Sequence, residues 1–67
     1  MKGKFQSGDV VYNSRYDFVG TIVRQTWGYH NGKKYIWGYH IEGHGNHTYY
    51  AVDMVLEKTR MLEEILR

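Results

Sequence analysis

Three histidines and a glutamate stand close together in the second half of the chain. His40, His44 and His47 fall within residues 40–47, with Glu42 between the first two. Imidazole is a common ligand for zinc and nickel, so these side chains are candidates for a divalent metal site. Their spacing does not orient them toward one point, because His40 and Glu42 share the face of an expected strand whereas His44 lies in a glycine-flanked loop. We therefore expect exposed loop histidines, with no metal and no other cofactor.

The sequence lacks the usual patterns of catalytic side chains. There is no Ser-His-Asp order and no cysteine, and the stretch GHGNH lacks the Lys-Ser or Lys-Thr ending of a phosphate-binding loop. A chain of 67 residues also leaves little room for a pocket that excludes water. We therefore expect a protein that is not an enzyme.

The aromatic residues point to binding instead, and many of them surround one turn. The sequence Trp-Gly-Tyr-His occurs at residues 27–30 and again at 37–40, on either side of Asn31-Gly32. Asn-Gly is a strong signal for a two-residue type I′ turn, because both residues tolerate the positive φ that this turn requires. The repeat therefore predicts the two arms of one β-hairpin, and not a tandem site.

The turn also fixes the expected pairing of the two arms. Trp27 should lie opposite Ile36, and Val23 opposite His40, so that the two tryptophans point to opposite faces of the hairpin. One face is assigned to the core of the protein. That face holds Ile22, Arg24, Thr26, Tyr35, Trp37, Tyr39 and Ile41.

The other face of the hairpin is expected to form an outward aromatic and basic surface. Trp27 has an alternative role, since an aromatic residue beside a strand glycine such as Gly28 often packs across it and shields the backbone. Tyr and Trp provide large rigid contact areas at small entropic cost, which favours a binding role. The residues predicted to bind a partner are Trp27, Tyr29, Lys33, Lys34, Ile36, Tyr16 and Arg15.

The rest of the chain reads as strands followed by a short helix. Besides the hairpin arms, of which the first should span residues 19–27, strands are expected at 10–12, 47–51 and 55–58, with Asp53 capping a short turn. Residues 59–67 are expected to form a helix, with Thr59 as its N-cap. A rival interpretation runs one helix over residues 53–67, but Lys58 and Thr59 would then interrupt its apolar stripe.

The predicted helix is too short to be stable alone in water. Its apolar stripe must therefore dock on the sheet, on another copy of the chain or on a partner, and self-association is one expected use of it. The stripe consists of Met61, Leu62, Ile65 and Leu66.

Length and charge set further bounds. A chain of 67 residues is expected to be one domain, covering residues 1–67, and it has no cysteine for a stabilising disulfide. Nine Lys and Arg against seven Asp and Glu give a net charge of +2, which permits contact with phosphates without demanding it. The N-terminus has no apolar stretch typical of a secretory signal or a membrane span, so a cytoplasmic location is expected.

The order of the expected elements resembles that of the SH3-like small barrels of bacteria and their phages. The resemblance covers residues 5–58 and is carried by "GDVV", "GTIV", "GYHIEG" and "YYAVDMVLEK" in this order. It implies an all-β fold, a five-stranded SH3-like barrel over residues 5–58 with a short C-terminal α-helix over 59–67. It also implies a non-catalytic module encoded by a phage or mobile element, which binds a protein partner.

The first half of the chain, "GDVVYNSRYDFVGTIV", looks like the KOW-type element of transcription and ribosomal proteins. That likeness implies the alternative function, a KOW- or Tudor-like protein that binds nucleic acid. Aromatic rings would then stack on bases, and basic side chains would contact phosphates. The stacking residues would be Trp27, Tyr29 and Tyr16, and the phosphate contacts Arg15, Arg24, Lys33 and Lys34.

A second resemblance concerns the type II dihydrofolate reductases, which are SH3-like tetramers. Their active pore is built around a Val-Gln-Ile-Tyr run, and the matching residues 47–50 of this chain read His-Thr-Tyr-Tyr. Tyr50 alone agrees with that run. The likeness therefore implies a shared fold and not reductase activity.

Overall fold

Residues 4–67 form five strands and one short α-helix. The computed structural model describes residues 4–67, and the first three residues of the predicted domain lie outside the described part. A turn of 3-10 helix, η1, joins the fourth and fifth strands. The elements are β1 (Val10–Asn13), β2 (Phe18–His30), β3 (Lys33–Ile41), β4 (Thr48–Tyr50), η1 (Ala51–Asp53), β5 (Met54–Leu56) and α1 (Glu57–Ile65). The predicted all-β class with a short C-terminal helix is confirmed.

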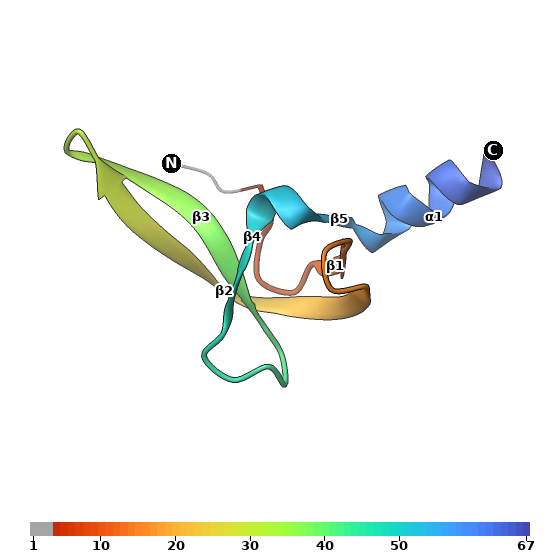
Figure 1. Cartoon of the computed structure of the whole chain (residues 1–67), viewed down its shortest axis with the longest axis horizontal. Helices are drawn as coiled ribbons and strands as arrows, with labels where there is room; N and C mark the ends of the chain where they lie inside the picture. The colour runs from red at the N-terminus through yellow and green to blue at the C-terminus, as the bar shows by residue number, and fades with distance from the viewer. Residues whose placement is uncertain (1–3) are drawn as a thin grey trace.

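The strands form one antiparallel sheet in the order β4-β3-β2-β1-β5. Within residues 4–67 the sheet is not closed into a barrel, since β4 and β5 are its two edges. The molecule is elongated, with extents of 43 × 24 × 20 Å. Figure 1 shows why: the β2–β3 hairpin reaches out at one end and α1 at the other.

The core lies where β1, β2, β3 and β5 come together beneath the N-terminal segment. At its centre the hydroxyl of Tyr39 accepts a hydrogen bond from the backbone N–H of Phe5 at 2.9 Å, and the two rings meet edge to face with centroids 5.3 Å apart. Ile22 and Ile41, predicted to lie in the core with Tyr39, are buried as expected. The buried apolar residues are Phe5, Val11, Ile22, Tyr39, Ile41 and Met54.

The chain reverses at the predicted turn. Asn31 and Gly32 have φ values of 51° and 75°, as a type I′ turn requires. Trp27 pairs with Ile36 as predicted, but the register shifts beyond it, because Thr26 pairs with Gly38 and leaves Trp37 as an extra residue. A bulge of this kind adds one unpaired residue to a strand and increases the local twist.

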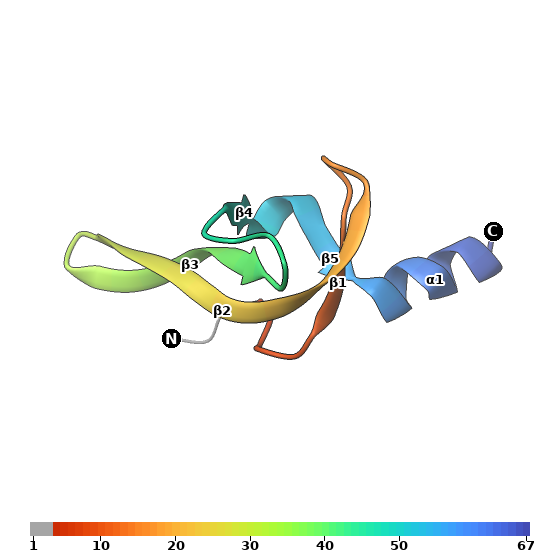
Figure 2. The same cartoon turned by 90° about the horizontal axis from the view of Figure 1, so that it is seen from below.

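A second register shift follows at Val23. Arg24 pairs with His40 and Ile22 with Ile41, so Val23 has no partner across the strand. The predicted pairing of Val23 with His40 is therefore wrong. The strongly curved path of β2 in Figure 2 is consistent with two bulges in one hairpin.

The bulges change which residues share a face of the hairpin. Gln25 and Trp27 alternate along β2, and their partners are Tyr39 and Ile36, so Trp27 lies on the face that carries the core. Arg24, predicted to lie on the core face, lies on the opposite one with His40. Thr26 and Tyr35 belong to that opposite face too, which corrects the predicted division of the hairpin.

The C-terminal elements begin earlier than predicted. β5 covers Met54–Leu56 instead of residues 55–58, and the same strand excludes the rival helix over residues 53–67. Asp53 ends the η1 turn and does not cap it. α1 begins at Glu57, so Thr59 lies inside its first turn instead of capping it, and the N-cap Leu56 makes no side-chain hydrogen bond.

Ionic contacts tie together the first turn of α1. Arg60 Nε and Nη2 donate to the two carboxylate oxygens of Glu57 at 2.5 and 2.9 Å, and Nη1 donates to Glu64 at 3.0 Å. Hydrogen bonding to Arg60 holds the pKa of Glu57 below its usual range. The Arg60 guanidinium also lies 4.5 Å from the centre of the Tyr12 ring, so it joins the first turn of α1 to β1.

The rest of α1 stands away from the sheet. None of its residues is buried, and the predicted apolar stripe of Met61, Leu62, Ile65 and Leu66 is exposed. Within residues 4–67, no helix is long and apolar enough to cross a membrane.

Candidate functional site

The β2–β3 hairpin continues well beyond the rest of the sheet. β1 pairs with β2 only over Phe18–Thr21, and β4 pairs with β3 only over Gly38–His40. The outer part of the hairpin, residues 24–37, is here called the hairpin arm. Beyond residues 24–26, which lie across from the part of β3 that β4 accompanies, the arm is a two-stranded ribbon (Figure 1). No side chain of residues 27–37 is buried.

Trp27, Tyr29 and Lys34 form one surface on this arm, but it lies on the face of the hairpin that carries the core and not on the opposite face, where it was predicted. The Lys34 ammonium lies 3.7 Å from the centre of the Trp27 ring, and the Trp27 and Tyr29 rings meet edge to face with centroids 6.1 Å apart. Trp27 is 48% exposed and Tyr29 68% exposed. The cation over the indole face is attracted by the ring quadrupole, which holds the two side chains together at the surface.

The aromatic ring that covers Gly28 from the opposite strand is Tyr35. A Cβ atom at Gly28 would meet the Tyr35 ring at 3.5 Å, an ordinary contact distance. Gly38, in the second copy of the repeat, lies much closer to β4: a Cβ there would stand 2.8 Å from the carbonyl oxygen of Tyr49. The two glycines therefore differ in how tightly they are enclosed.

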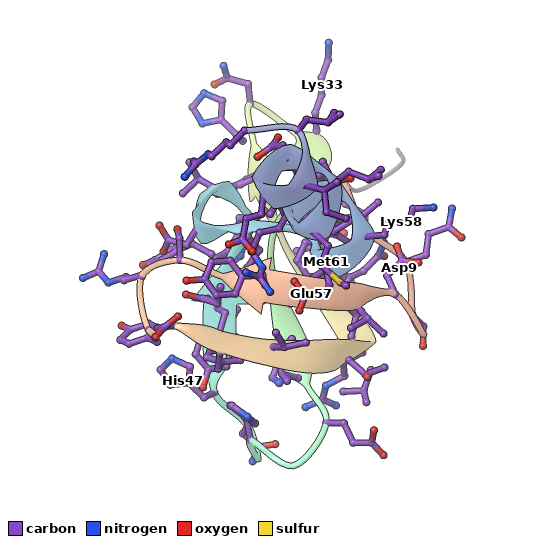
Figure 3. All side chains as sticks on the ribbon, turned by 90° about the vertical axis from the view of Figure 1, so that its right-hand side faces the viewer. Asp9, Lys33, His47, Glu57, Lys58 and Met61 are labelled. Carbon is purple, nitrogen blue, oxygen red and sulfur yellow. The ribbon has the colours of Figure 1, made fainter. Side chains whose placement is uncertain are left out.

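Lys33 and Ile36, both predicted to bind a partner, have different surroundings. Lys33 is exposed beside the turn, and Figure 3 shows its side chain reaching away from the body of the molecule. With His30, Lys34 and Tyr35 it lines an open depression on the arm. Ile36 is half-buried and packs against the core cluster, so its main contacts are structural.

The hairpin carries positive charge only. Between Phe18 and Ile41 the sequence has no Asp or Glu, whereas it has Arg24, Lys33 and Lys34. The net charge of this segment is thus +3, against +2 for the whole chain. A charge of one sign on an exposed arm attracts groups of the opposite sign during encounter.

Tyr16 and Arg15, by contrast, have their contacts outside the arm. The Tyr16 ring contacts those of Tyr49 and His47, at centroid distances of 5.8 and 6.5 Å, and the Arg15 guanidinium lies 5.6 Å from the Tyr16 ring. Phe18, at the start of β2, also packs on Tyr49. The structure therefore does not join Tyr16 and Arg15 to the predicted surface.

These contacts belong to an aromatic cluster between two loops. No local pattern predicts it, because the cluster forms only when the loop after β3 folds against the loop after β1. His47 and Lys33 lie on opposite sides of the molecule in Figure 3. The loop cluster consists of Tyr16, Phe18, His44, His47 and Tyr49.

The three candidate metal ligands do not converge. His40 is buried and its Nε2 lies 3.2 Å from the Thr48 hydroxyl, so it is not an exposed loop residue. His44 Nδ1 shares a hydrogen bond of 2.6 Å with the Tyr49 hydroxyl, and the His47 ring packs on Tyr49 at 4.3 Å. Among residues 4–67 there is no group of three or more His, Cys, Asp or Glu side chains placed to hold a metal ion.

Comparison of the chain with protein-family models, with curated proteins and with solved structures found no match. A function is therefore inferred from the side chains and backbone of the chain itself. The feature with the clearest chemical character is the hairpin arm. It combines exposed aromatic rings, positive charge and two strands whose outer parts, among residues 4–67, pair only with each other.

Proposed function

We propose that the chain is a non-catalytic interaction module that binds a protein partner through its hairpin arm. The observation that carries the proposal is the exposed pair of Trp27 and Tyr29, held next to Lys34 outside the core. Tyr and Trp are the residues that most often dominate the free energy of protein association, because a rigid ring buries a large area with few torsions to fix.

The proposal includes the SH3-like resemblance. The strand order, with β5 beside β1 and a short 3-10 turn before β5, supports it. By that resemblance the module belongs to a phage or mobile element, and its proposed location is the cytoplasm. It assigns no catalytic residue and no cofactor.

Nucleic-acid binding is the second candidate. The absence of acidic residues between Phe18 and Ile41 favours it, together with the exposed rings of Trp27 and Tyr29. Three positive charges on the arm are few for a surface that must neutralise a phosphate backbone. One of the three, Lys34, lies on the Trp27 ring, so charge and aromatic area form one mixed surface, which fits a protein partner better than a phosphate backbone.

The test is a pull-down from a bacterial lysate with wild type, Trp27→Ala and Tyr16→Ala. Tyr16 is a matched control, because it is about as exposed as Trp27 but lies in the loop cluster. We expect Trp27→Ala to lose partners that wild type and Tyr16→Ala retain. Equal recovery by all three, with native circular dichroism spectra, contradicts the assignment of the arm.

Binding of labelled oligonucleotides, measured at two salt concentrations, distinguishes nucleic-acid binding from protein binding. A protein-binding module is expected to show at most weak binding. Micromolar affinity that falls steeply with salt identifies phosphate contacts and makes nucleic acid the principal ligand.

A further inference from the structure

The outer half of β3 has a free edge. β4 accompanies β3 only from His40 to Gly38, and the chain then leaves the sheet at Ala51 as the η1 turn. Residues 33–37 therefore have β2 on one side and, among residues 4–67, no strand on the other. A free edge of this kind is a template for pairing with another chain.

The position of the turn determines which backbone groups point outward. His30 and Lys33 flank the two-residue turn and form a hydrogen-bonded pair, so the next pair, Tyr29 and Lys34, is not hydrogen-bonded. Alternation makes Trp27 and Ile36 a non-hydrogen-bonded pair as well. The N–H and C=O groups of Lys34 and Ile36 therefore point away from β2, toward the free edge.

The charge of this edge selects the kind of strand that fits. Lys33 and Lys34 lie on it, and no acidic residue lies anywhere on the hairpin to neutralise them. A second copy of the chain pairing by the same edge would bring the lysines of both copies together, which repels that arrangement. A strand with acidic side chains would instead be attracted by the charges of Lys33 and Lys34.

Neighbouring side chains extend the edge on the β4 side. Tyr50 and Val52 are exposed where β4 stops, and the Tyr50 ring packs on Trp37 at 5.5 Å. On the other side, Lys33 and Tyr35 border the depression at the tip of the arm. A strand laid between them meets apolar surface at one end and positive charge at the other.

We propose that the partner binds through an extended acidic segment, which adds to the free edge of β3 as a further strand next to β4. Backbone hydrogen bonds to Lys34 and Ile36 supply the pairing, and the two lysines select acidic side chains. This inference rests on the proposed function, because it names the chemistry and the binding mode of the partner of the same arm.

The first test uses a short capped peptide of alternating Glu and Val as the probe. Amide hydrogen exchange is followed residue by residue in the full chain with and without the peptide. We expect slower exchange at Lys34 and Ile36, whose N–H groups gain partners, and little change at Lys33 and Tyr35, whose N–H groups already face β2. Slowing at all four amides, or at none, overturns the added strand.

Two altered probes keep the test independent of how well variants fold. N-methylation of every second residue removes the N–H groups along one edge of the peptide, so two methylated peptides can be made, one for each edge. We expect one of the two to bind at least about tenfold more weakly than the unmethylated peptide. A peptide of alternating Lys and Val is expected not to bind. Equal binding of methylated and unmethylated peptides, or of Lys and Glu peptides, contradicts the inference.

Lys34→Pro and Lys34→Ala provide the test on the protein side. Both remove the charge, but only proline removes the outward N–H, and proline is tolerated at strand edges. We expect Lys34→Pro to bind the Glu-Val peptide about tenfold more weakly than Lys34→Ala. Equal affinity of the two folded variants counts against backbone pairing.

The outcomes separate this inference from the proposed function. If Trp27→Ala loses its partners in the pull-down but the peptide protects no amide of β3, the arm binds protein in another mode and the added strand is wrong. If sedimentation shows a dimer in which Lys34 and Ile36 are protected without peptide, the edge belongs to a second copy. Displacement of the peptide by an oligonucleotide assigns the edge to nucleic acid.

Discussion

The Tyr39 hydroxyl lies 2.9 Å from the backbone nitrogen of Phe5, and both residues are fully enclosed in the core. This hydrogen bond ties the N-terminal segment to the middle of β3. Tyr39→Phe leaves the Phe5 N–H without its partner, so we expect a loss of about 1–3 kcal/mol in the free energy of unfolding. Urea denaturation followed by circular dichroism measures it.

Tyr35→Phe is the matched control for that variant. The Tyr35 ring is 40% exposed and lies on the hairpin arm, so removal of its hydroxyl is expected to change the free energy of unfolding by less than about 0.5 kcal/mol. Similar losses for both variants show that the Tyr39 hydroxyl adds no stability of its own.

The two glycines of the repeated Trp-Gly-Tyr-His sequence give a second prediction. Gly38→Ala places a Cβ atom 2.8 Å from the Tyr49 carbonyl oxygen, which forces the backbone of β4 to move. Gly28→Ala meets only the Tyr35 ring at 3.5 Å. We expect Gly38→Ala to lower the unfolding free energy by at least about 2 kcal/mol and Gly28→Ala by less than about 1 kcal/mol. Tolerance of Gly38→Ala contradicts the close approach of β3 and β4.

Acid should loosen the first turn of α1. Since Arg60 lowers the pKa of Glu57 in the folded chain, the ion pair contributes stability above the unfolded pKa of glutamate, about 4.3. That contribution is lost as the pH falls through the lower folded pKa. Helical circular dichroism is expected to fall with acid in wild type and to depend less on pH in Glu57→Gln.

Glu63→Gln serves as the comparison for the acid titration, because Glu63 has no ion-pair partner among residues 4–67. Its titration curve is expected to follow that of wild type. If Glu57→Gln and Glu63→Gln behave alike, the loss of helix reflects the overall charge and not the contact with Arg60.

The exposed stripe of α1 leads to a fourth prediction. Leu62 is 58% exposed, so Leu62→Glu is expected to change the unfolding free energy by less than about 0.5 kcal/mol. The same substitution is expected to abolish any rise of the sedimentation coefficient with protein concentration, since self-association would bury this stripe. A large fall in stability shows that α1 packs on the sheet in solution.

Local signals predicted the hairpin well up to its bulges. Asn31-Gly32 specified the turn, and the turn specified the pairs from His30–Lys33 to Trp27–Ile36. The bulges at Val23 and Trp37 have no such signal, because they depend on how the sheet curves over the core. For that reason the core residues Ile22, Tyr39 and Ile41 were assigned correctly, whereas the faces assigned between the bulges and the turn were reversed.

The repeated sequence shows that two identical tetrapeptides can have different surroundings in the folded chain. Tyr29 is exposed, whereas Tyr39 is buried in the core, and His30 stands at the turn whereas His40 is enclosed beneath β4. The start of α1 escaped prediction on similar grounds, since the contact of Arg60 with Tyr12 on β1 is a tertiary one.

The pairing of β1 with β5 has a consequence for the order in which the protein folds. Val11 pairs with Leu56 from far along the sequence, whereas β2 and β3 are joined by two residues. In refolding the hairpin can close early, but β1 gains its outer neighbour only after the longest loop of the sheet has closed. A chain truncated before Met54 should therefore expose the β1 edge to chaperones and proteases.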